Sequence, residues 1–172
     1  MSVRKISGFT IFEMMIVVAI TGIATAFAVP EFQDMMARNR VGAAADEMVN
    51  ALSAARNTAI SRRRDVVMTR TGTVWESRLD NATTGIKLGR LETQSPVIAT
   101  FWQGATVSND VTQMTFEPSG LVKKTSGGTE SLSLTIRYCD SGSRRETGKD
   151  ITVSRIGRIV AKKHSSLSTC NP

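Results

Sequence analysis

Few residues of this 172-residue chain have a type and spacing that could support chemistry. The reactive side chains are two cysteines, Cys139 and Cys170, and a single histidine, His164. A redox or metal site would normally show a C-x-x-C pair or further imidazoles, and many hydrolases show a G-x-S-x-G turn; the sequence contains none of these. We therefore expect no enzyme, no cofactor and no metal, and a solvated His164 in a polar tail.

One carboxylate, Glu13, occupies an unusual position. It is the only ionisable side chain in the 21-residue apolar run from Phe9 to Val29. At about 1.5 Å per residue, this run is as long as the roughly 30 Å hydrocarbon core of a membrane. Because two basic residues precede the run, we expect residues 1–8 to stay cytoplasmic and the rest of the chain to be exported.

Three interpretations of this segment compete. A secretory signal would be cut near Ala26-Phe27-Ala28, a plain anchor would stay uncut, and a prepilin would be cut just after Gly8 and keep its apolar helix. A carboxylate in a membrane-spanning helix costs about 2.5–3.5 kcal/mol, so Glu13 needs a partner. Only cleavage after Gly8 supplies one, the new amine of Phe9 on the same or a neighbouring subunit.

Residues 8–13, GFTIFE, resemble the signal GFTLIE of type IV pilins and type II secretion pseudopilins. The resemblance implies that prepilin peptidase cuts between Gly8 and Phe9, that Phe9 is N-methylated, that Glu13 acts in subunit assembly and that Pro30 kinks the helix. It also implies residence in inner-membrane lipid with a periplasmic C-terminal domain, and then transfer by an assembly platform into a cell-surface filament of major and minor pilins.

The helix is expected to continue past Pro30 as far as Arg62. Apolar residues recur there at intervals of four and three, which is typical of one buried helical face. The members of this stripe are Val41, Ala45, Met48, Leu52, Ala55 and Ala59. The predicted organisation is a leader (1–8), a transmembrane or filament-core half-helix (9–29), an amphipathic half-helix (30–62) and a β-rich domain (63–172).

Beyond residue 63 the pattern predicts strands separated by Gly, Asn, Asp and Ser turns. The predicted strands are Asp65–Arg70, Thr73–Glu76, Ile86–Leu91, Val97–Trp102, Gln113–Glu117, Leu132–Tyr138, Ile151–Ser154 and Arg158–Ala161. The expected fold class is α+β, a pilin-like long N-terminal helix packed against antiparallel sheet. In the oxidising periplasm the two cysteines, Cys139 and Cys170, are expected to form a disulfide, with a redox or metal pair as the alternative.

Two further motifs resemble the GspH/FimT class of minor pilins and pseudopilins. They are FEPSGLV at residues 116–122 and ITVSRIGRIV at residues 151–160. Membership implies a low-copy structural or initiating subunit of a type IV pilus, for which the tip is one candidate location. The alternatives within the class are a DNA-binding minor pilin for natural transformation and a minor pseudopilin of type II secretion.

The basic residues bear on the DNA-binding alternative. The chain has a formal net charge of +7, which favours anionic partners. The candidate DNA contacts are Arg155, Arg158, Lys162 and Lys163. DNA-binding members of the class resemble one another in a G-R-x-R motif, of which Gly157-Arg158 matches only the first half, because Val160 replaces the second arginine. A solvated or filament-packing charge run is the simpler interpretation.

Overall fold

The computed structural model of the chain describes residues 9–95, 97–103, 106–107, 112–124, 134–140 and 148–164. The chain forms two compact units, Met1–Met36 and Ala37–Pro172. The leader with Gly8, and Cys170 near the C-terminus, lie outside the described residues. Predictions about these two residues therefore stay predictions.

The α-helix α1 runs from Ile11 to Arg62 and continues through Pro30. The prediction began it two residues earlier and ended it at the same residue. Arg63 ends the helix in the left-handed conformation (φ 52°). Arg64 N donates to Ala59 O at 3.3 Å, the six-residue closure of a Schellman cap, which satisfies a carbonyl of the last turn.

The predicted stripe of α1 is buried. All six of its members, from Val41 to Ala59, are at most 3% exposed. Asp46 and Asn57, which lie between them, are exposed, whereas Val49 and Ala51 are partly buried. The stripe packs in one hydrophobic cluster with side chains of the strands, and this burial is the main driving force for placing the helix there.

Within the described residues ten strands follow α1, and all eight predicted strands are present. Their bounds are β1 Val66–Thr71, β2 Val74–Leu79, β3 Lys87–Glu92, β4 Val97–Gln103, β5 Thr106–Val107, β6 Gln113–Phe116, β7 Val122–Lys124, β8 Leu134–Asp140, β9 Gly148–Val153 and β10 Ile159–His164. The short strands β5 and β7 were not predicted. Strand β9 begins three residues earlier than predicted, because it pairs along almost the whole of β8.

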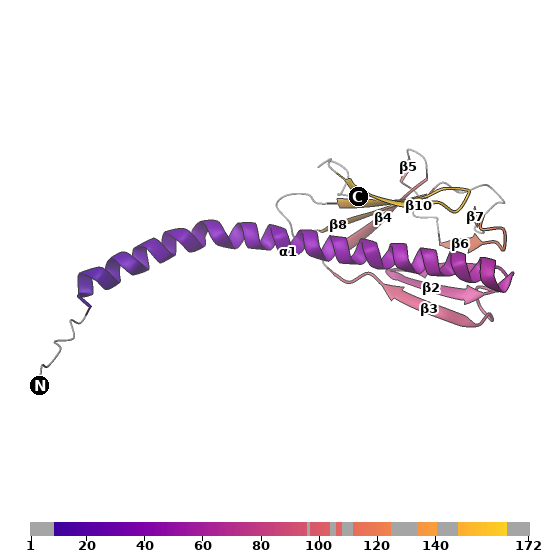
Figure 1. Cartoon of the computed structure of the whole chain (residues 1–172), viewed down its shortest axis with the longest axis horizontal. Coiled ribbons are helices and arrows are strands. Elements are labelled where there is room, and N and C mark those ends of the chain that lie inside the picture. The colour runs from indigo at the N-terminus through magenta and orange to yellow at the C-terminus, as the bar shows by residue number, and fades with distance from the viewer. Residues whose placement is uncertain are drawn as a thin grey trace, which may run out of the picture. The chain divides into compact units, whose positions relative to one another are not determined.

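The strands form two antiparallel sheets, with orders β3-β2-β1-β6-β7 and β10-β9-β8-β4-β5. The core cluster draws on α1 and on both sheets, and Figure 1 shows the second half of α1 beside β2, β3, β4 and β8. Two ion pairs join α1 to the second sheet. Arg40 bonds the fully buried carboxylate of Asp140 at 2.9 Å, and Asp46 bonds Lys149 at 2.6 Å. The expected α+β fold class is confirmed.

Two hairpin turns contact each other beside α1. Gly120, in the β6–β7 turn, and Gly157, in the β9–β10 turn, both have positive φ, at 80° and 74°. Val122 N donates to Arg155 O at 3.0 Å, and Arg56 Nε of α1 donates to Gly120 O at 3.2 Å. The two short sequence motifs, FEPSGLV and ITVSRIGRIV, are therefore the two turns that join the sheets to each other and to the helix.

Gly157→Ala is predicted to destabilise the domain strongly. A Cβ at this position would lie 2.1 Å from the backbone oxygen of Gly120 and 2.5 Å from Arg56 Nε, in addition to the left-handed strain. We expect a loss of at least about 3 kcal/mol in the free energy of unfolding, measured by denaturant titration of the chain in detergent with tryptophan fluorescence.

Gly72→Ala is the matched control for this change. Gly72 also has positive φ, at 62°, but no atom lies within 4 Å of the added Cβ. This variant should lose only about 1–2 kcal/mol, from strain alone. Equal losses in the two variants would show that the contact between the turns contributes nothing.

The burial of Tyr138 predicts that the domain becomes less stable at high pH. Burial, with a smaller contribution from the negative charge of Glu47, raises the pKa of Tyr138 to about 12. In the unfolded chain tyrosine has a pKa near 10. Tyr138 in the folded state therefore keeps its proton up to a higher pH than it does in the unfolded chain. The contribution of Tyr138 to the free energy of unfolding is fully present below about pH 10. It falls as the pH rises toward 12, by about 2–3 kcal/mol in total.

Tyr138→Phe should remove this part of the pH dependence, because phenylalanine has no proton to lose. Denaturant midpoints of both proteins, measured between pH 9 and pH 12, should diverge with the native protein falling more steeply. Parallel curves would contradict the assignment, since lysine titration affects both proteins alike.

Candidate assembly and binding surfaces

The first turn of α1 explains part of the role of Glu13. Thr10 N donates to Glu13 Oε2 at 3.1 Å, and Glu13 N donates to Thr10 Oγ1 at 3.2 Å. This reciprocal pair is a capping box with Thr10 as N-cap, and the carboxylate also lies at the positive end of the helix. Sequence reasoning missed it, although the T-x-x-E spacing is its recognised signature.

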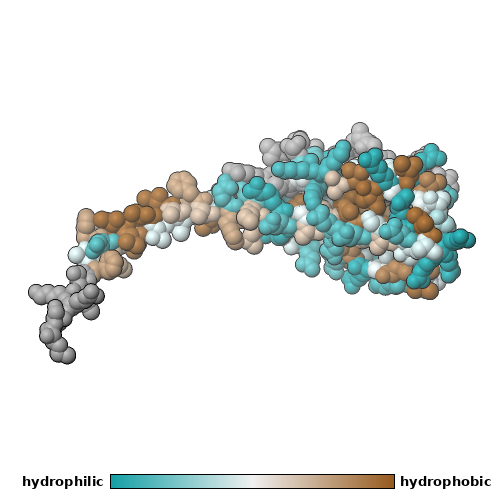
Figure 2. Space-filling view, viewed as in Figure 1, coloured by the Kyte–Doolittle hydropathy of each residue, from teal (hydrophilic) through white to brown (hydrophobic). Residues whose placement is uncertain are grey.

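The apolar side chains of residues 9–36 are uncovered. Phe9, Ile11 and Phe27 are at least 73% exposed. Figure 2 shows a largely brown surface along this segment. By length and composition α1 can cross a membrane, and its most apolar 18-residue window is 0% buried. An exposed apolar surface of this size marks a site for contact with lipid or with another protein.

The other predicted assembly residues are placed as follows. Phe9 lies just before the helix and is 80% exposed. Pro30 lies inside α1, where it removes one hydrogen-bond donor. The kink at Pro30, the cleavage at Gly8 and the methylation of Phe9 stay predictions.

Cys139 lies near the end of β8 and is 3% exposed. Its partner in the register is Gly148 on β9, and its chain neighbour Asp140 is held by Arg40 of α1. The disulfide to Cys170 stays a prediction. Among the described residues, no group of three His, Cys, Asp or Glu side chains could hold a metal ion.

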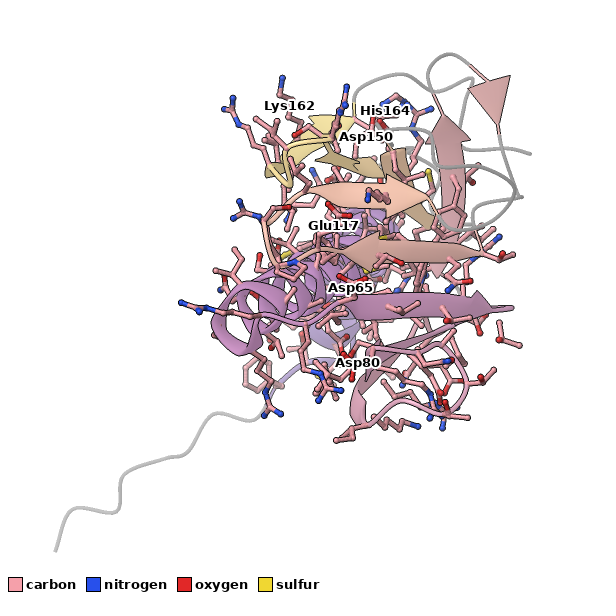
Figure 3. The ribbon with its side chains drawn as sticks, turned by 90° about the vertical axis from the view of Figure 1, so that its right-hand side faces the viewer. Asp65, Asp80, Glu117, Asp150, Lys162 and His164 are labelled. Atoms are coloured by element: carbon pink, nitrogen blue, oxygen red, sulfur yellow. The ribbon has the colours of Figure 1, made fainter. Side chains whose placement is uncertain are left out.

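The expectation that His164 is solvated is wrong. Its Nδ1 lies 3.0 Å from Asp150 Oδ2, and its side chain is 14% exposed. Asp150 also accepts two bonds from Arg137, from Nε at 2.7 Å and from a terminal nitrogen at 3.0 Å. Figure 3 shows Asp150 and His164 side by side. Strand pairing brings these residues together, which a strand prediction ending at Ala161 did not anticipate.

The structure does not bring the four candidate DNA contacts onto one face. All four are exposed. Arg155 and Arg158 belong to the β9–β10 turn, whereas Lys162 and Lys163 lie on β10 opposite Asp150 and Lys149. Because neighbouring residues of a strand point to opposite faces, the two lysines are separated by the sheet.

Two other arginines lie at the same end of the domain as the β9–β10 turn. Arg62 is the last residue of α1, and Arg63 follows it. The helix contacts this turn through Arg56. We call Arg62, Arg63, Arg155 and Arg158 the arginine surface. All four are exposed, and none forms an ion pair with another described residue.

The arginine surface adds four positive charges to one end of the domain, in a chain of net charge +7. Three anionic residues near it are Asp65, Asp80 and Glu117, which are labelled in Figure 3. Two of them are already paired, Asp80 with Arg64 and Glu117 with Lys123.

Comparisons of sequence match two family models. The model described as "Type II transport protein GspH" covers residues 44–157, and the one described as "Prokaryotic N-terminal methylation motif" covers residues 3–29. A fimbrial protein of Pseudomonas aeruginosa is 47% identical over 64 residues, which are 37% of this chain and 41% of that protein. The major fimbrial protein FimA of Dichelobacter nodosus is 59% identical over 34 residues, which are 20% of this chain and 21% of that protein. The chain thus spans less than half the length of these relatives.

Two solved structures share the fold. The type IV minor pilin FimU of Pseudomonas aeruginosa has a TM-score of 0.57 at 22% identity, covering 75% of this chain and 96% of that one. The minor pseudopilin EpsH of the Vibrio cholerae type 2 secretion system has a TM-score of 0.55 at 13% identity, covering 72% and 97%. With the GspH model matching well over half of its length, the chain belongs to the GspH family of pilin-like proteins and carries their N-terminal methylation motif.

Proposed function

We propose that this chain is a minor pilin, a low-copy structural or initiating subunit located at or near the tip of a type IV pilus. Prepilin peptidase cuts it between Gly8 and Phe9, and Phe9 is N-methylated. The inner membrane holds residues 9–29, with the C-terminal domain in the periplasm. An assembly platform then moves the subunit into the filament, where it contacts other major and minor pilins.

The observation that carries this proposal is a carboxylate in the first turn of an uncovered apolar helix. The capping bonds between Thr10 and Glu13 contribute about 1 kcal/mol. Burying the charge in a membrane costs about 2.5–3.5 kcal/mol. The cap alone does not offset this cost, so a further cation must act on Glu13. The amine of Phe9, exposed by cleavage after Gly8, supplies it within or between subunits.

A pilus and a type II secretion filament use the same fold, as FimU and EpsH show by their similarity to this chain. The local sequence matches to fimbrial proteins favour the pilus. A pilus subunit should be recovered from filaments sheared off the cell surface. A secretion pseudopilin should instead stay with the cell envelope.

Substitutions at Glu13 separate its charge from its capping bonds. Glu13→Gln keeps the capping box but removes the charge, and Glu13→Ala removes both. We expect both variants to insert in the membrane and neither to enter filaments, measured by immunoblotting of the membrane and sheared fractions. If Glu13→Gln enters filaments as well as the native chain, the charge has no assembly role and only the cap matters.

A second function, DNA binding, is favoured by the concentration of charge at one end of the domain. The arginine surface leaves four guanidinium groups without ion-pair partners among the described residues. Such groups bind phosphates by charge and by planar hydrogen bonding, without reading base sequence. The DNA-capturing activity would then reside in the arginine surface and not in Lys162 and Lys163.

DNA binding should therefore depend on the arginine surface. The triple variant Arg62→Gln, Arg155→Gln and Arg158→Gln should weaken binding and lower the slope of log affinity against log salt by about 2–3, one unit for each lost phosphate contact. Fluorescence anisotropy of the full chain in detergent with duplex DNA measures this slope.

The double variant Lys162→Gln and Lys163→Gln is the matched control, and it should change binding much less. A native chain that fails to bind DNA at low salt would exclude this second function. The minor-pilin proposal would remain untouched by that result.

A further inference from the structure

A hollow of about 450 Å³ opens between the second half of α1 and the strands β2 and β3. Trp75, Leu88 and Leu91 are among the apolar residues that line it, and α1 contributes the small side chains of Ala51 and Ala54. Ala54 is exposed and Leu88 is half-buried. The hollow is therefore a depression of the protein surface at the edge of the hydrophobic core.

A second hollow, of about 460 Å³, continues along the same flank of α1. It shares Glu47 with the first, and α1 again contributes alanines, Ala43 and Ala44. The two hollows, which we call the α1 groove, follow the helix from Arg40 to Arg62, a length of about 33 Å at 1.5 Å per residue.

The shape of the α1 groove suits a helix better than an added strand. Alanine side chains along one flank let a second helix approach to the usual 8–10 Å between axes. A strand would have to pair with the free edge of β3. That edge carries the exposed charges Lys87 and Arg90, and the register between β2 and β3 shifts between Ser77 and Arg78. Charged and irregular edges of this kind discourage strand addition.

The chain also indicates which helix would fit. Residues 14–29 form an uncharged helical surface about 24 Å long, close to the length of the α1 flank of the first hollow, which runs from Glu47 to Arg62 over about 23 Å. Large side chains of this segment, such as Ile20, Ile23 and Phe27, are 62–73% exposed. The charged side chains along the groove's α1 flank, such as Glu47 and Arg62, are exposed. The first hollow is lined mainly by apolar residues, which match this segment, whereas polar residues such as Glu92 and Gln94 contribute much of the lining of the second. An apolar helix leaving the membrane has to exchange lipid for a protein surface of this kind.

We propose that the α1 groove binds the uncharged N-terminal helical segment, residues 14–29 or their equivalent, of a neighbouring subunit in the same filament. This inference rests on the proposed function, because only an assembled subunit has such a neighbour. It adds a defined docking surface on the globular domain to the contacts that the N-terminal helices make with one another.

Site-specific photocrosslinking tests the inference in the full chain. A benzophenone amino acid replaces Ala54 on the groove wall, in cells that assemble the filament, and mass spectrometry identifies the peptide joined to it. We expect peptides from residues 9–36 of another copy, or from the N-terminal helix of another pilin. The matched control places the same group at Asn57, which is exposed on α1 but does not line the groove, and should yield several-fold less of these peptides.

A variant that fills part of the α1 groove with a larger side chain gives an independent measurement. Ala54→Trp should insert in the membrane normally but enter filaments several-fold less than the native chain, whereas Asn57→Trp should enter normally. Crosslinks from position 54 only to β-domain peptides or to lipid, in a subunit that does enter filaments, would overturn the groove inference alone. A native chain that never enters filaments would overturn both this inference and the proposed function.

Discussion

Burial of one face of α1 is the interaction on which the rest of the structure depends. Ala45, Met48 and Leu52 have no exposed surface, and the core of both sheets closes around them. The same continuous helix is uncharged on all sides from Met14 to Val29 and apolar on one side from Val41 onward. One helix thereby combines an exposed apolar half with a half that its own domain buries.

A second constraint on the structure is that both sheets pack against the same helix. Hydrophobic burial does not by itself fix how the sheets meet, because it has no direction. Directional contacts do so here: Arg40 with the buried Asp140, and Arg56 with the paired turns at Gly120 and Gly157. The two glycines are required because their backbone conformation and the close approach of the turns leave no room for a side chain. The arginine surface is a consequence of this arrangement, since the turn that contacts α1 carries Arg155 and Arg158.

The sequence predicted the parts of the structure that depend on local pattern. The stripe from Val41 to Ala59 and the strand at Leu132–Tyr138 follow directly from helical and strand patterns. Strands β5 and β7 were missed because two or three residues cannot establish a period. The capping box at Thr10 and Glu13 was readable from its spacing and was overlooked. In contrast, the contact of His164 with Asp150 depends on strand register, and the close approach of Arg56 to Gly157 depends on tertiary packing between residues far apart in the sequence.

The central claim is that the apolar helix is retained and becomes part of a filament. The most direct measurement is mass spectrometry of the N-terminal peptide of this chain in filaments sheared from cells. The account predicts a chain that begins at Phe9, carries one methyl group on its amine and is present in the filament fraction. A chain that begins near Val29 and is found free in the periplasm would contradict it, because the helix would then have served only as a secretion signal.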